Sequence, residues 1–265
     1  KNVPSGTRIR QKEHRNTIEI PFEEVAAPIN EQRARLSLGS LGGGNHFIEL
    51  NEGEDGSIYL VIHSGSRNLG KQIAEHYQQV AADTLGNSVS RDLAYVEGDN
   101  MKDYLYDLSI AQKYAAFNRK TMVDVICRGM NWSVQSEFDT IHNYIDLDNM
   151  ILRKGAISAQ ADEIVIIPMN MRDGSLICRG KGNPEWNYSG PHGAGRLMSR
   201  SQARKQVALE DFQASMEGIW STSVVSATVD ESPFAYKAME DILAHIHDTV
   251  DVLEVIKPIY NYKAH

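Results

Sequence analysis

Four histidines lie close to glycine or asparagine, at the ends of predicted strands or helices or in a short apolar segment. They are His46, His63, His142 and His192. A neutral imidazole is the commonest metal ligand in proteins, and nearby glycines let the backbone approach a phosphate closely. Any one of these residues alone is more often a structural histidine than a ligand. Together they indicate a site for a metal ion or a phosphate group.

The segment around His192 has the most distinctive local pattern. Pro191 precedes it and a Gly-Ala-Gly run follows it. We expect this loop to open a helix whose free N-terminal amides favour an anion. His192 then suits a metal or phosphate site, or alternatively a residue that caps the helix. The pattern differs from the Gly-x-Gly-x-x-Gly and Gly-Lys-Ser/Thr nucleotide motifs, so a bound nucleotide would need another architecture.

Three arginines follow this segment at helical spacing. Arg196, Arg200 and Arg204 would lie on one face of a helix. A solvated helix face and a surface for phosphate contacts both fit such a stripe. Its position directly after the His192 segment favours phosphate contact.

The composition is typical of a globular protein and excludes several other classes. Apolar residues make up 42% and charged residues 23% of the 265 residues, which is ordinary for a chain with one well-filled core. A formal net charge of −8 argues against a protein that coats nucleic acid nonspecifically. No apolar run approaches the roughly 18 residues that span a bilayer. The first residues do not resemble a secretion signal.

The two cysteines, Cys127 and Cys178, lie far apart and form no Cys-x-x-Cys pair. This excludes a disulfide scaffold and a zinc ribbon, and it favours a reducing, cytoplasmic compartment. Each cysteine follows two apolar residues, so we expect both to be small buried core residues.

Strand and helix patterns alternate along the chain. Apolar runs predict strands at 58–62 and 164–167, the second paired with 175–179 across a turn at 170–174. Helical spacing covers 67–85, 103–130, 196–217 and 234–248, and 253–262 is a final strand interrupted by Pro258. The predicted fold class is α+β, a single domain with mixed sheets surrounded by helices.

Six segments resemble the successive motifs of the RtcB RNA ligase family, in the family's order. They are GGGNHFIE (42–49), HSGSRNLG (63–70), HN (142–143), RKGA (153–156), HGAGRLMSR (192–200) and DESPFAYK (230–237). HGAGR followed by MSR is the most specific element, and the resemblance runs from about Ser37 to Lys263. It implies one RtcB-like catalytic domain over residues 1–265 that uses GTP and Mn²⁺, with two ions in the complete enzyme.

The resemblance also implies roles for individual residues. His192 would take GMP from GTP as a transient phosphoramidate, a bond that imidazole forms and releases readily. His46, His63 and His142 would bind the metal. Contacts to the guanylate would come from Asn45, Glu49, Asn143, Ser175, Gly193, Ala194, Gly195, Tyr236 and Lys263. Tyr236 would either stack on the base or pack in the core from a helix that it shares with Met239 and Ile242.

The family's N-terminal Asp-x-x-Cys motif, which supplies a carboxylate and a thiolate to the metals, is absent. A manganese site of histidines alone would lack the anionic ligands that hold a divalent ion. We therefore expect the chain to lack the N-terminal part of the domain.

The function implied is an RNA ligase that joins a 2′,3′-cyclic phosphate or 3′-phosphate end to a 5′-hydroxyl end. Its partners would be RNA and GTP, with no membrane. A catalytically silent relative that only binds nucleotide or RNA ends is the alternative, favoured by the missing motif. A metal phosphoesterase of another family would explain the other histidines but not His192 in its loop.

Overall fold

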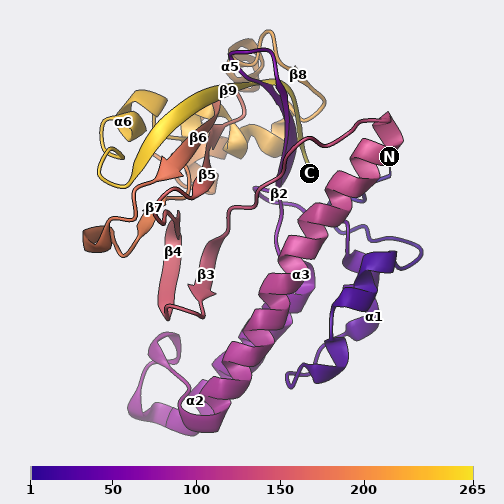
Figure 1. Cartoon of the computed structure of the whole chain (residues 1–265), viewed down its shortest axis with the longest axis vertical. Coiled ribbons are helices and arrows are strands. Elements are labelled where there is room, and N and C mark those ends of the chain that lie inside the picture. Colours follow the sequence, from indigo (N-terminus) through magenta and orange to yellow (C-terminus); the bar gives the residue numbers. More distant parts are fainter. Residues whose placement is uncertain (1, 265) are drawn as a thin grey trace. The chain divides into compact units, whose positions relative to one another are not determined.

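The computed structural model describes residues 2–264, with the backbone alone at position 87. The chain divides into two compact units. One contains Lys1–Gly42 and His63–Ser133, and the other contains Gly43–Ile62 and Val134–His265. Helices and sheets are both extensive, which confirms the α+β class (Figure 1). Among residues 2–264, no helix is both long and apolar enough to cross a membrane.

Two long helices dominate the first unit. α2 (Arg67–Leu85) has its predicted range, and α3 (Gly98–Met130) begins earlier than predicted. Their apolar residues recur at helical spacing and bury one face against α1 (Glu31–Ser37) and the N-terminal segment. Short 3₁₀ helices complete the unit: η1 (Arg15–Glu19), η2 (Phe22–Glu24), η3 (Gly86–Ser88) and η4 (Arg91–Leu93).

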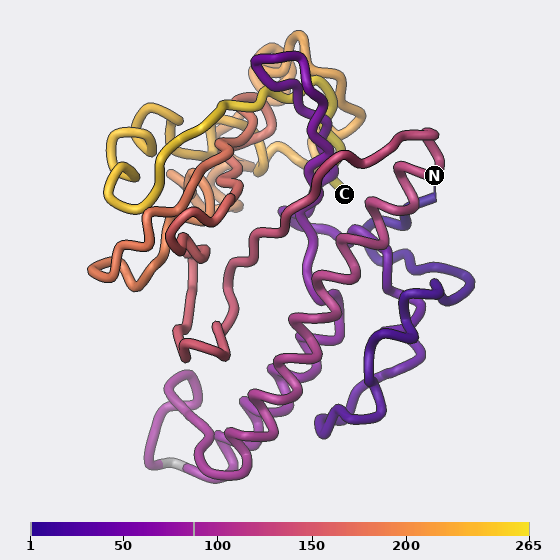
Figure 2. Tube along the Cα trace, in the orientation of Figure 1, coloured from indigo at the N-terminus to yellow at the C-terminus, as the bar shows by residue number. Residues whose placement is uncertain are grey.

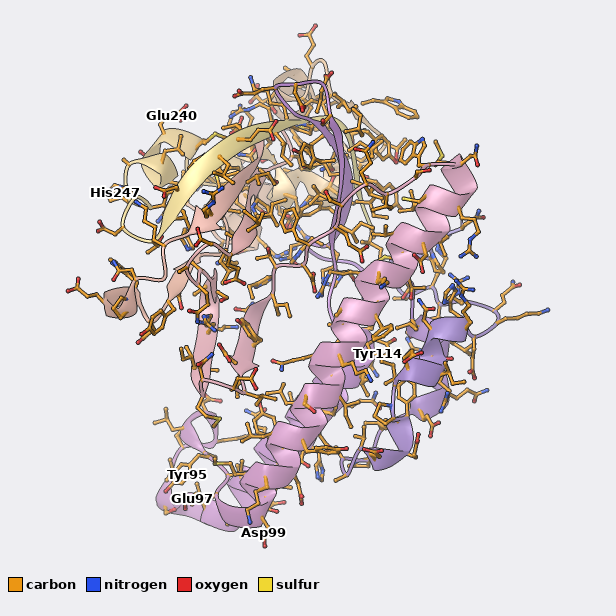
Figure 3. All side chains as sticks on the ribbon, viewed as in Figure 1. Tyr95, Glu97, Asp99, Tyr114, Glu240 and His247 are labelled. Atoms are coloured by element: carbon orange, nitrogen blue, oxygen red, sulfur yellow. The ribbon has the colours of Figure 1, made fainter. Side chains whose placement is uncertain are left out.

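Buried polar side chains of α3 fix the segments around it. Tyr114, labelled in Figure 3, donates a hydrogen bond to the carbonyl of Ala34 at 2.8 Å. Asn118 accepts from the backbone of Gly39 at 2.7 Å and donates to the carbonyl of Gly65 at 3.1 Å. The HSGSR segment is therefore held by α3, because a buried amide that lost these bonds would be costly.

The second unit is built on a curved sheet with the strand order β2-β1-β9-β6-β5, and β8 also pairs with β9. Its strands are β1 (Phe47–Glu52), β2 (Ile58–His63), β5 (Ile164–Asn170), β6 (Gly174–Gly180), β8 (Trp220–Ser221) and β9 (Val250–Lys263). Strands β1 and β6 each pair antiparallel with β9, whereas β8 is parallel to it. Figure 2 traces the early β1–β2 segment beside the yellow C-terminal strand. The last residues of the chain thus meet residues near position 50.

The sequence predicted that Pro258 would interrupt the last strand. This prediction is wrong. β9 continues through the proline, and the register with β1 shifts at Leu50 and Asn51, where Asn51 faces Pro258. A proline has no N–H to give to the ladder, so it is tolerated at such an irregularity. The predicted pairing of 164–167 with 175–179 is confirmed as the β5–β6 hairpin.

A second sheet has the order β3-β4-β7 and is antiparallel. It consists of β3 (His142–Asp146), β4 (Ile151–Ser158) and β7 (Ser189–Pro191), with η5 (Pro184–Trp186) before β7. Ile157 and Ala159 pack with Val165, Ile167 and other buried residues of the first sheet. The two sheets of this unit therefore share one core.

The helices predicted after residue 190 are shorter than expected. The range 196–217 holds α4 (Arg200–Gln206) and α5 (Leu209–Ser215), separated by extended backbone at Val207 and Ala208. The helix predicted over 234–248 is wrong, because only α6 (Met239–Leu243) is helical there, after the 3₁₀ helices η6 (Ser226–Glu231) and η7 (Pro233–Ala235). Tyr236 is extended and lies on no helix.

The cysteines are core residues, as predicted. Cys127 lies on α3 and Cys178 on β6, and both thiols are free and buried. Burial raises the pKa of Cys178 to about 12, and it raises the pKa of Cys127 as well. Neither thiol is therefore a ready thiolate ligand.

Candidate functional site

His192 directly follows β7, and its ring is held by the neighbouring strand β4. The Nδ1 atom lies 2.7 Å from the carbonyl oxygen of Gly155. A carbonyl can only accept, so Nδ1 carries the proton of the neutral ring and Nε2 keeps its lone pair. His192 is half-buried. The backbone of β4 thus fixes the ring so that the Nε2 lone pair remains available for a bond.

His142 and Asn143 lie against the same point of β4. The ring centroids of His142 and His192 are 5.0 Å apart, and the planes differ by 33°. The Asn143 side chain accepts from the backbone N–H of Gly155 at 2.8 Å. The backbone N–H of Gly155 is therefore hydrogen-bonded to Asn143, and its carbonyl oxygen to His192. The predicted residues His142, Asn143 and His192 come together here.

The helix predicted to open at His192 is wrong. Leu197 N donates to the carbonyl of Ala235 at 2.9 Å, and Lys237 N donates to the carbonyl of Gly195 at 3.1 Å. Gly195 has a φ of 72°, which is outside the helical region. This loop is paired with the chain after η7, and helix α4 begins only at Arg200, capped by Ser199.

Gly193 and Ala194 run along the end of β5. The backbone N–H of Ala194 donates to the carbonyl of Pro168 at 3.2 Å. A Cβ on Gly193 would lie 3.0 Å from that same oxygen, closer than most side chains tolerate. The glycine is therefore needed for the loop to lie this close to β5, and that contact places His192 at the edge of the sheet.

Arg153 lies beneath the site, with 2% of its surface exposed. Its guanidinium donates to Asp146, Tyr144 and the Ser189 hydroxyl at 3.1, 2.9 and 2.8 Å. Burial opposes ionisation of Asp146, yet hydrogen bonds from Asn149 and Arg153 hold its pKa below the ordinary value. The buried guanidinium of Arg153 thus ties together β3, which holds His142, β4, which holds Gly155, and β7, which precedes His192.

Glu49 is buried on β1, opposite Asn261 on β9. The Asn261 amide donates to its carboxylate. Burial raises the pKa of Glu49 from 4.5 to about 7, although Asn261, Asn51 and Lys263 favour the ionised form. Near neutral pH this group is therefore close to the midpoint of its titration.

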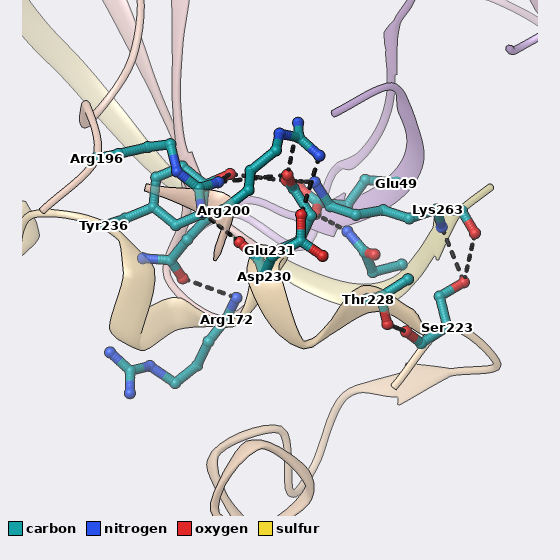
Figure 4. A network of polar contacts seen from close by, with 12 residues as sticks. Glu49, Arg172, Arg196, Arg200, Ser223, Thr228, Asp230, Glu231, Tyr236 and Lys263 are labelled. Carbon is teal, nitrogen blue, oxygen red and sulfur yellow. Dashed lines mark hydrogen bonds and ion pairs between the residues drawn. The ribbon is translucent and has the colours of Figure 1, made fainter. Parts of the chain in front are cut away.

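Glu231 is the centre of a polar network in the same unit (Figure 4). Its Oε2 atom accepts from Lys263 Nζ at 2.8 Å and from the Tyr236 hydroxyl at 2.7 Å. Its Oε1 atom faces Arg200 at 2.9 Å and Arg196 at 3.4 Å. One carboxylate thus receives two of the predicted guanylate contacts and two arginines of the stripe.

The three arginines converge on one acidic pair rather than on one helix face. Arg196 precedes α4, and its guanidinium also donates to the backbone carbonyl of Asp230 at 2.6 Å. Arg200 and Arg204 lie on α4 and pair with the Asp230 carboxylate at 3.0 and 3.2 Å. Four cations, Lys263 included, thus surround two buried carboxylates, so positive charge is in excess. An anion such as a phosphate suits this surplus.

A comparison with known protein families matches residues 4–264 to the family described as tRNA-splicing ligase RtcB. The chain belongs to the RtcB family. It is 35% identical over 245 residues to the RNA-splicing ligase RtcB of Escherichia coli K12, covering 84% of this chain and 60% of the relative.

More distant RtcB relatives show the same coverage. The tRNA-splicing ligase RtcB of Aeropyrum pernix is 26% identical, over 89% of this chain and 60% of the relative. The RNA-splicing ligase RtcB of Mycobacterium tuberculosis is 28% identical, over 82% of this chain and 62% of the relative. The chain thus spans about 60% of the length of these curated RtcB proteins.

The metal ligands that the RtcB resemblance implies fall in both units. His46 directly precedes β1 and His142 begins β3 in the second unit, whereas His63 belongs to the first. Within residues 2–264, no three His, Cys, Asp or Glu side chains form a group that would hold a metal ion. Metal binding by these histidines therefore stays a prediction.

The predicted guanylate contacts have polar groups that suit their ligand more clearly than the predicted metal ligands do. Guanine offers acceptors at O6 and N7 and a donor amino group, so a carboxylate and an ammonium group complement it. Glu49 and Lys263 supply these groups from neighbouring strands. The hydroxyl of Ser175, on β6, is buried and makes no hydrogen bond to any described residue, which leaves it available to a ligand. Asn45 is exposed in the loop before β1.

Sequence reasoning missed several residues of the site. Gly155 and Glu231 lie in the motifs RKGA and DESPFAYK, yet no role for either followed from the sequence. Asn261 carries no motif signal, because its role comes from facing Glu49 across two strands. Asp124 and Cys127 do repeat the Asp-x-x-Cys spacing, but on helix α3, where the thiol is buried.

Proposed function

We propose that this chain is the catalytic part of an RNA ligase in which His192 carries GMP from GTP to RNA. The observation that carries the proposal is the hydrogen bond from His192 Nδ1 to the Gly155 carbonyl, since it leaves the lone pair on Nε2. The names of the relatives, RNA-splicing and tRNA-splicing ligases, support RNA as the substrate.

The first step is attack of Nε2 on the α-phosphorus of GTP. The P–N bond forms as the bond to the bridging oxygen breaks, and pyrophosphate leaves. Nδ1 keeps its proton throughout, and the Gly155 carbonyl stabilises the positive charge that the ring acquires. Imidazole is also a good leaving group, so the phosphoramidate remains reactive.

Two further transfers would complete ligation. An oxygen of the RNA 3′-phosphate attacks the same phosphorus, the P–N bond breaks, and Nε2 regains its lone pair. A 5′-hydroxyl then attacks the activated 3′-phosphate and loses its proton to solvent, GMP leaves, and the phosphodiester forms. An RNA with a 2′,3′-cyclic phosphate must first be opened to the 3′-phosphate, and a bound Mn²⁺ ion would supply the activated water for this.

Recognition of guanine is assigned to the buried polar residues of the large sheet. The Glu49 carboxylate would accept from the guanine amino and N1–H groups, and Lys263 would donate to O6. Adenine offers the opposite pattern on this edge, so the pair would favour GTP. Tyr236, Ser175, Asn45, Asn143 and the backbone of Gly193, Ala194 and Gly195 are proposed as the other guanylate contacts.

His192→Asn in the full-length protein tests the nucleophile. Labelled GMP from α-labelled GTP should stay with the wild-type protein through denaturation and should be lost from the variant. His245→Asn is a matched control, because His245 Nδ1 also lies 2.7 Å from a backbone carbonyl, that of Asp241. Covalent label on the His192→Asn variant would refute the assignment. Nucleotide binding without any label on the wild type would favour the silent binding module.

We further propose that His46, His63 and His142 bind Mn²⁺, as the family resemblance implies. Titration of the full-length protein with Mn²⁺, followed by the electron paramagnetic resonance signal of the free ion, measures this directly. Each His→Ala change should weaken Mn²⁺ binding at least about tenfold, as loss of a metal-site group does. His245→Ala should bind normally. Unchanged Mn²⁺ affinity in the three variants would show that these histidines do not bind Mn²⁺.

A further inference from the structure

Glu231 accepts hydrogen bonds from several side chains, yet it is not among the residues that the family resemblance assigns to the nucleotide. Its surface is 2% exposed. The donors come from β9, the segment after η7, the loop after β7 and helix α4 (Figure 4). An ionised carboxylate with this many charged donors is held firmly, because each such bond is stronger than a neutral one. Glu231 therefore orients the groups that point at it.

Tyr236 is oriented through its hydroxyl group. Burial, together with the neighbouring Glu231, raises the pKa of Tyr236, so the hydroxyl keeps its proton and donates it to Glu231. The guanidinium of Arg196 lies 5.1 Å from the ring centroid, on one face of the ring. The ring is thus held at its polar end and from one side, which fixes its plane.

Lys263 is oriented by the same carboxylate. Its ammonium pairs with Glu231 at 2.8 Å and lies 5.4 Å from the centroid of the Phe47 ring. Glu49, on β1, is instead hydrogen-bonded by Asn261, two residues before Lys263 on β9. Lys263 contributes least among the groups that act on Glu49. The ammonium of Lys263 is thus paired with Glu231, whereas the carboxyl group of Glu49 is bound by Asn261.

We propose that Glu231 is a positioning residue that holds Lys263 and Tyr236 for the guanine nucleotide and keeps Lys263 apart from Glu49. This inference rests on the proposed nucleotide site. It assigns Glu231 no contact with the reacting atoms. Its effect passes through Lys263 and Tyr236, so it concerns nucleotide affinity and selectivity rather than the rate of phosphoryl transfer.

Asp230, the adjacent residue, provides a matched control. It is as buried as Glu231 and also pairs with arginines, but the hydrogen bonds and ion pairs of Lys263 and Tyr236 described above go to Glu231 instead. Asp230→Asn and Glu231→Gln remove the same charge from the same 3₁₀ helix. A merely structural role of this acidic pair would make the two variants behave alike.

The first measurement needs no ligand. In Glu231→Gln we expect the freed ammonium of Lys263 to interact more strongly with Glu49, a carboxyl group on which it already acts. The pKa of Glu49 should then fall towards its ordinary value. Denaturant unfolding from pH 4 to 8 should show a smaller loss of stability with rising pH than in the wild type. Asp230→Asn should keep the wild-type profile.

The second measurement is equilibrium binding of GTP and ATP to the full-length variants. Glu231→Gln should bind GTP about tenfold more weakly, the equivalent of one charged hydrogen bond. Its preference for GTP over ATP should shrink, while the single-turnover rate of His192 labelling at saturating GTP should change little. Glu231→Asp, which restores the charge, should recover part of the affinity, and Asp230→Asn should keep the GTP preference.

Glu231→Gln leaves the buried Lys263 without its counter-ion and could unfold the protein. A double variant keeps the inference testable if this happens. Glu231→Gln with Lys263→Met removes both charges and should fold, because no unpaired charge is left buried. The GTP affinity of this double variant should equal that of Lys263→Met alone, apart from a smaller loss of affinity because Tyr236 is no longer held by Glu231. An equal loss in Asp230→Asn, or wild-type GTP affinity and pH profile in Glu231→Gln, would overturn the inference.

Failure of the proposed function gives a different result. A wild-type protein that binds GTP selectively but never labels His192 rejects the nucleophile and leaves Glu231 as a binding determinant. A wild-type protein that does not prefer GTP to ATP rejects both proposals.

Discussion

Gly155 presents its carbonyl oxygen to His192 Nδ1 at 2.7 Å, although the two residues are 37 positions apart. Gly155 has a φ of 70°, a region that side chains rarely adopt. The glycine therefore combines a backbone conformation that favours glycine with the carbonyl that holds the histidine ring.

Gly155→Ala should therefore lower the rate of His192 labelling more than stability alone explains. The new Cβ would lie 3.7 Å from the His192 ring, an ordinary contact, so the damage comes from the backbone. The expected cost in stability is about 1–2 kcal/mol. Gly56→Ala has the same kind of φ in the β1–β2 turn, with no atom near its Cβ. It should lose similar stability and keep its labelling rate. Equal rates in both variants would show that the Gly155 carbonyl is not needed.

The stability of the protein should fall as pH rises from about 4.5 to about 7, because of Glu49. Burial raises the pKa of Glu49 to about 7 in the folded chain, so the folded state holds its proton longer than the unfolded state does. Stability then falls with rising pH in this window, by about 1.4 kcal/mol for each unit of pKa difference. Urea unfolding across this pH range measures the effect. Glu49→Gln should flatten it, and an identical slope in that variant would assign the titration to another group.

The affinity for GTP should rise between pH 6 and 8, around the pKa of Glu49. The Glu49 carboxylate must be ionised to accept from two guanine donors, and with a pKa of about 7 it ionises only near neutrality. Binding of GTP should therefore strengthen between pH 6 and 8, whereas ATP binding should not. In Glu49→Gln the pH dependence should disappear and GTP affinity should be low throughout. Wild-type binding that does not change with pH would exclude this contact.

Arg153→Leu should destabilise the protein by about 1–3 kcal/mol, because it leaves the partly buried Asp146 carboxylate without its counter-ion. Guanidinium denaturation reports the loss. Arg172 pairs with Asp173 at the surface and serves as the comparison. Arg172→Leu should cost no more than about 1 kcal/mol. Similar losses in the two variants would mean that Arg153 does not fasten the β3-β4-β7 sheet.

Charge reversal in the arginine stripe should separate structure from RNA binding. Arg200 faces two buried carboxylates and Arg204 faces one, so Arg200→Glu should lower the melting temperature more than Arg204→Glu. A stripe that merely lay on a solvated helix face would leave stability unchanged. Both variants should bind RNA more weakly and with a flatter salt dependence. Lys205→Glu, an exposed neighbour on α4, is the control for net charge. Normal RNA binding together with early melting would make the stripe purely structural.

The sequence by itself determined several of the local elements and the family. The helix at 67–85 and the β5–β6 hairpin follow from periodicity and turn residues that act over a few positions. The ordered motifs, with HGAGR at their centre, are likewise local, and they were enough to identify the RtcB family. Patterns of this range were also enough to place both cysteines in the core.

Only the tertiary structure decided how these pieces meet. The loop after His192 is not helical, because its backbone pairs with residues 235–237, a contact that no local spacing encodes. The convergence of Arg196, Arg200 and Lys263 on Glu231 depends on where β9 and α4 lie in the folded unit. Hydrogen bonds between distant segments follow strand order and register, and these are set by packing of the whole core rather than by neighbouring residues.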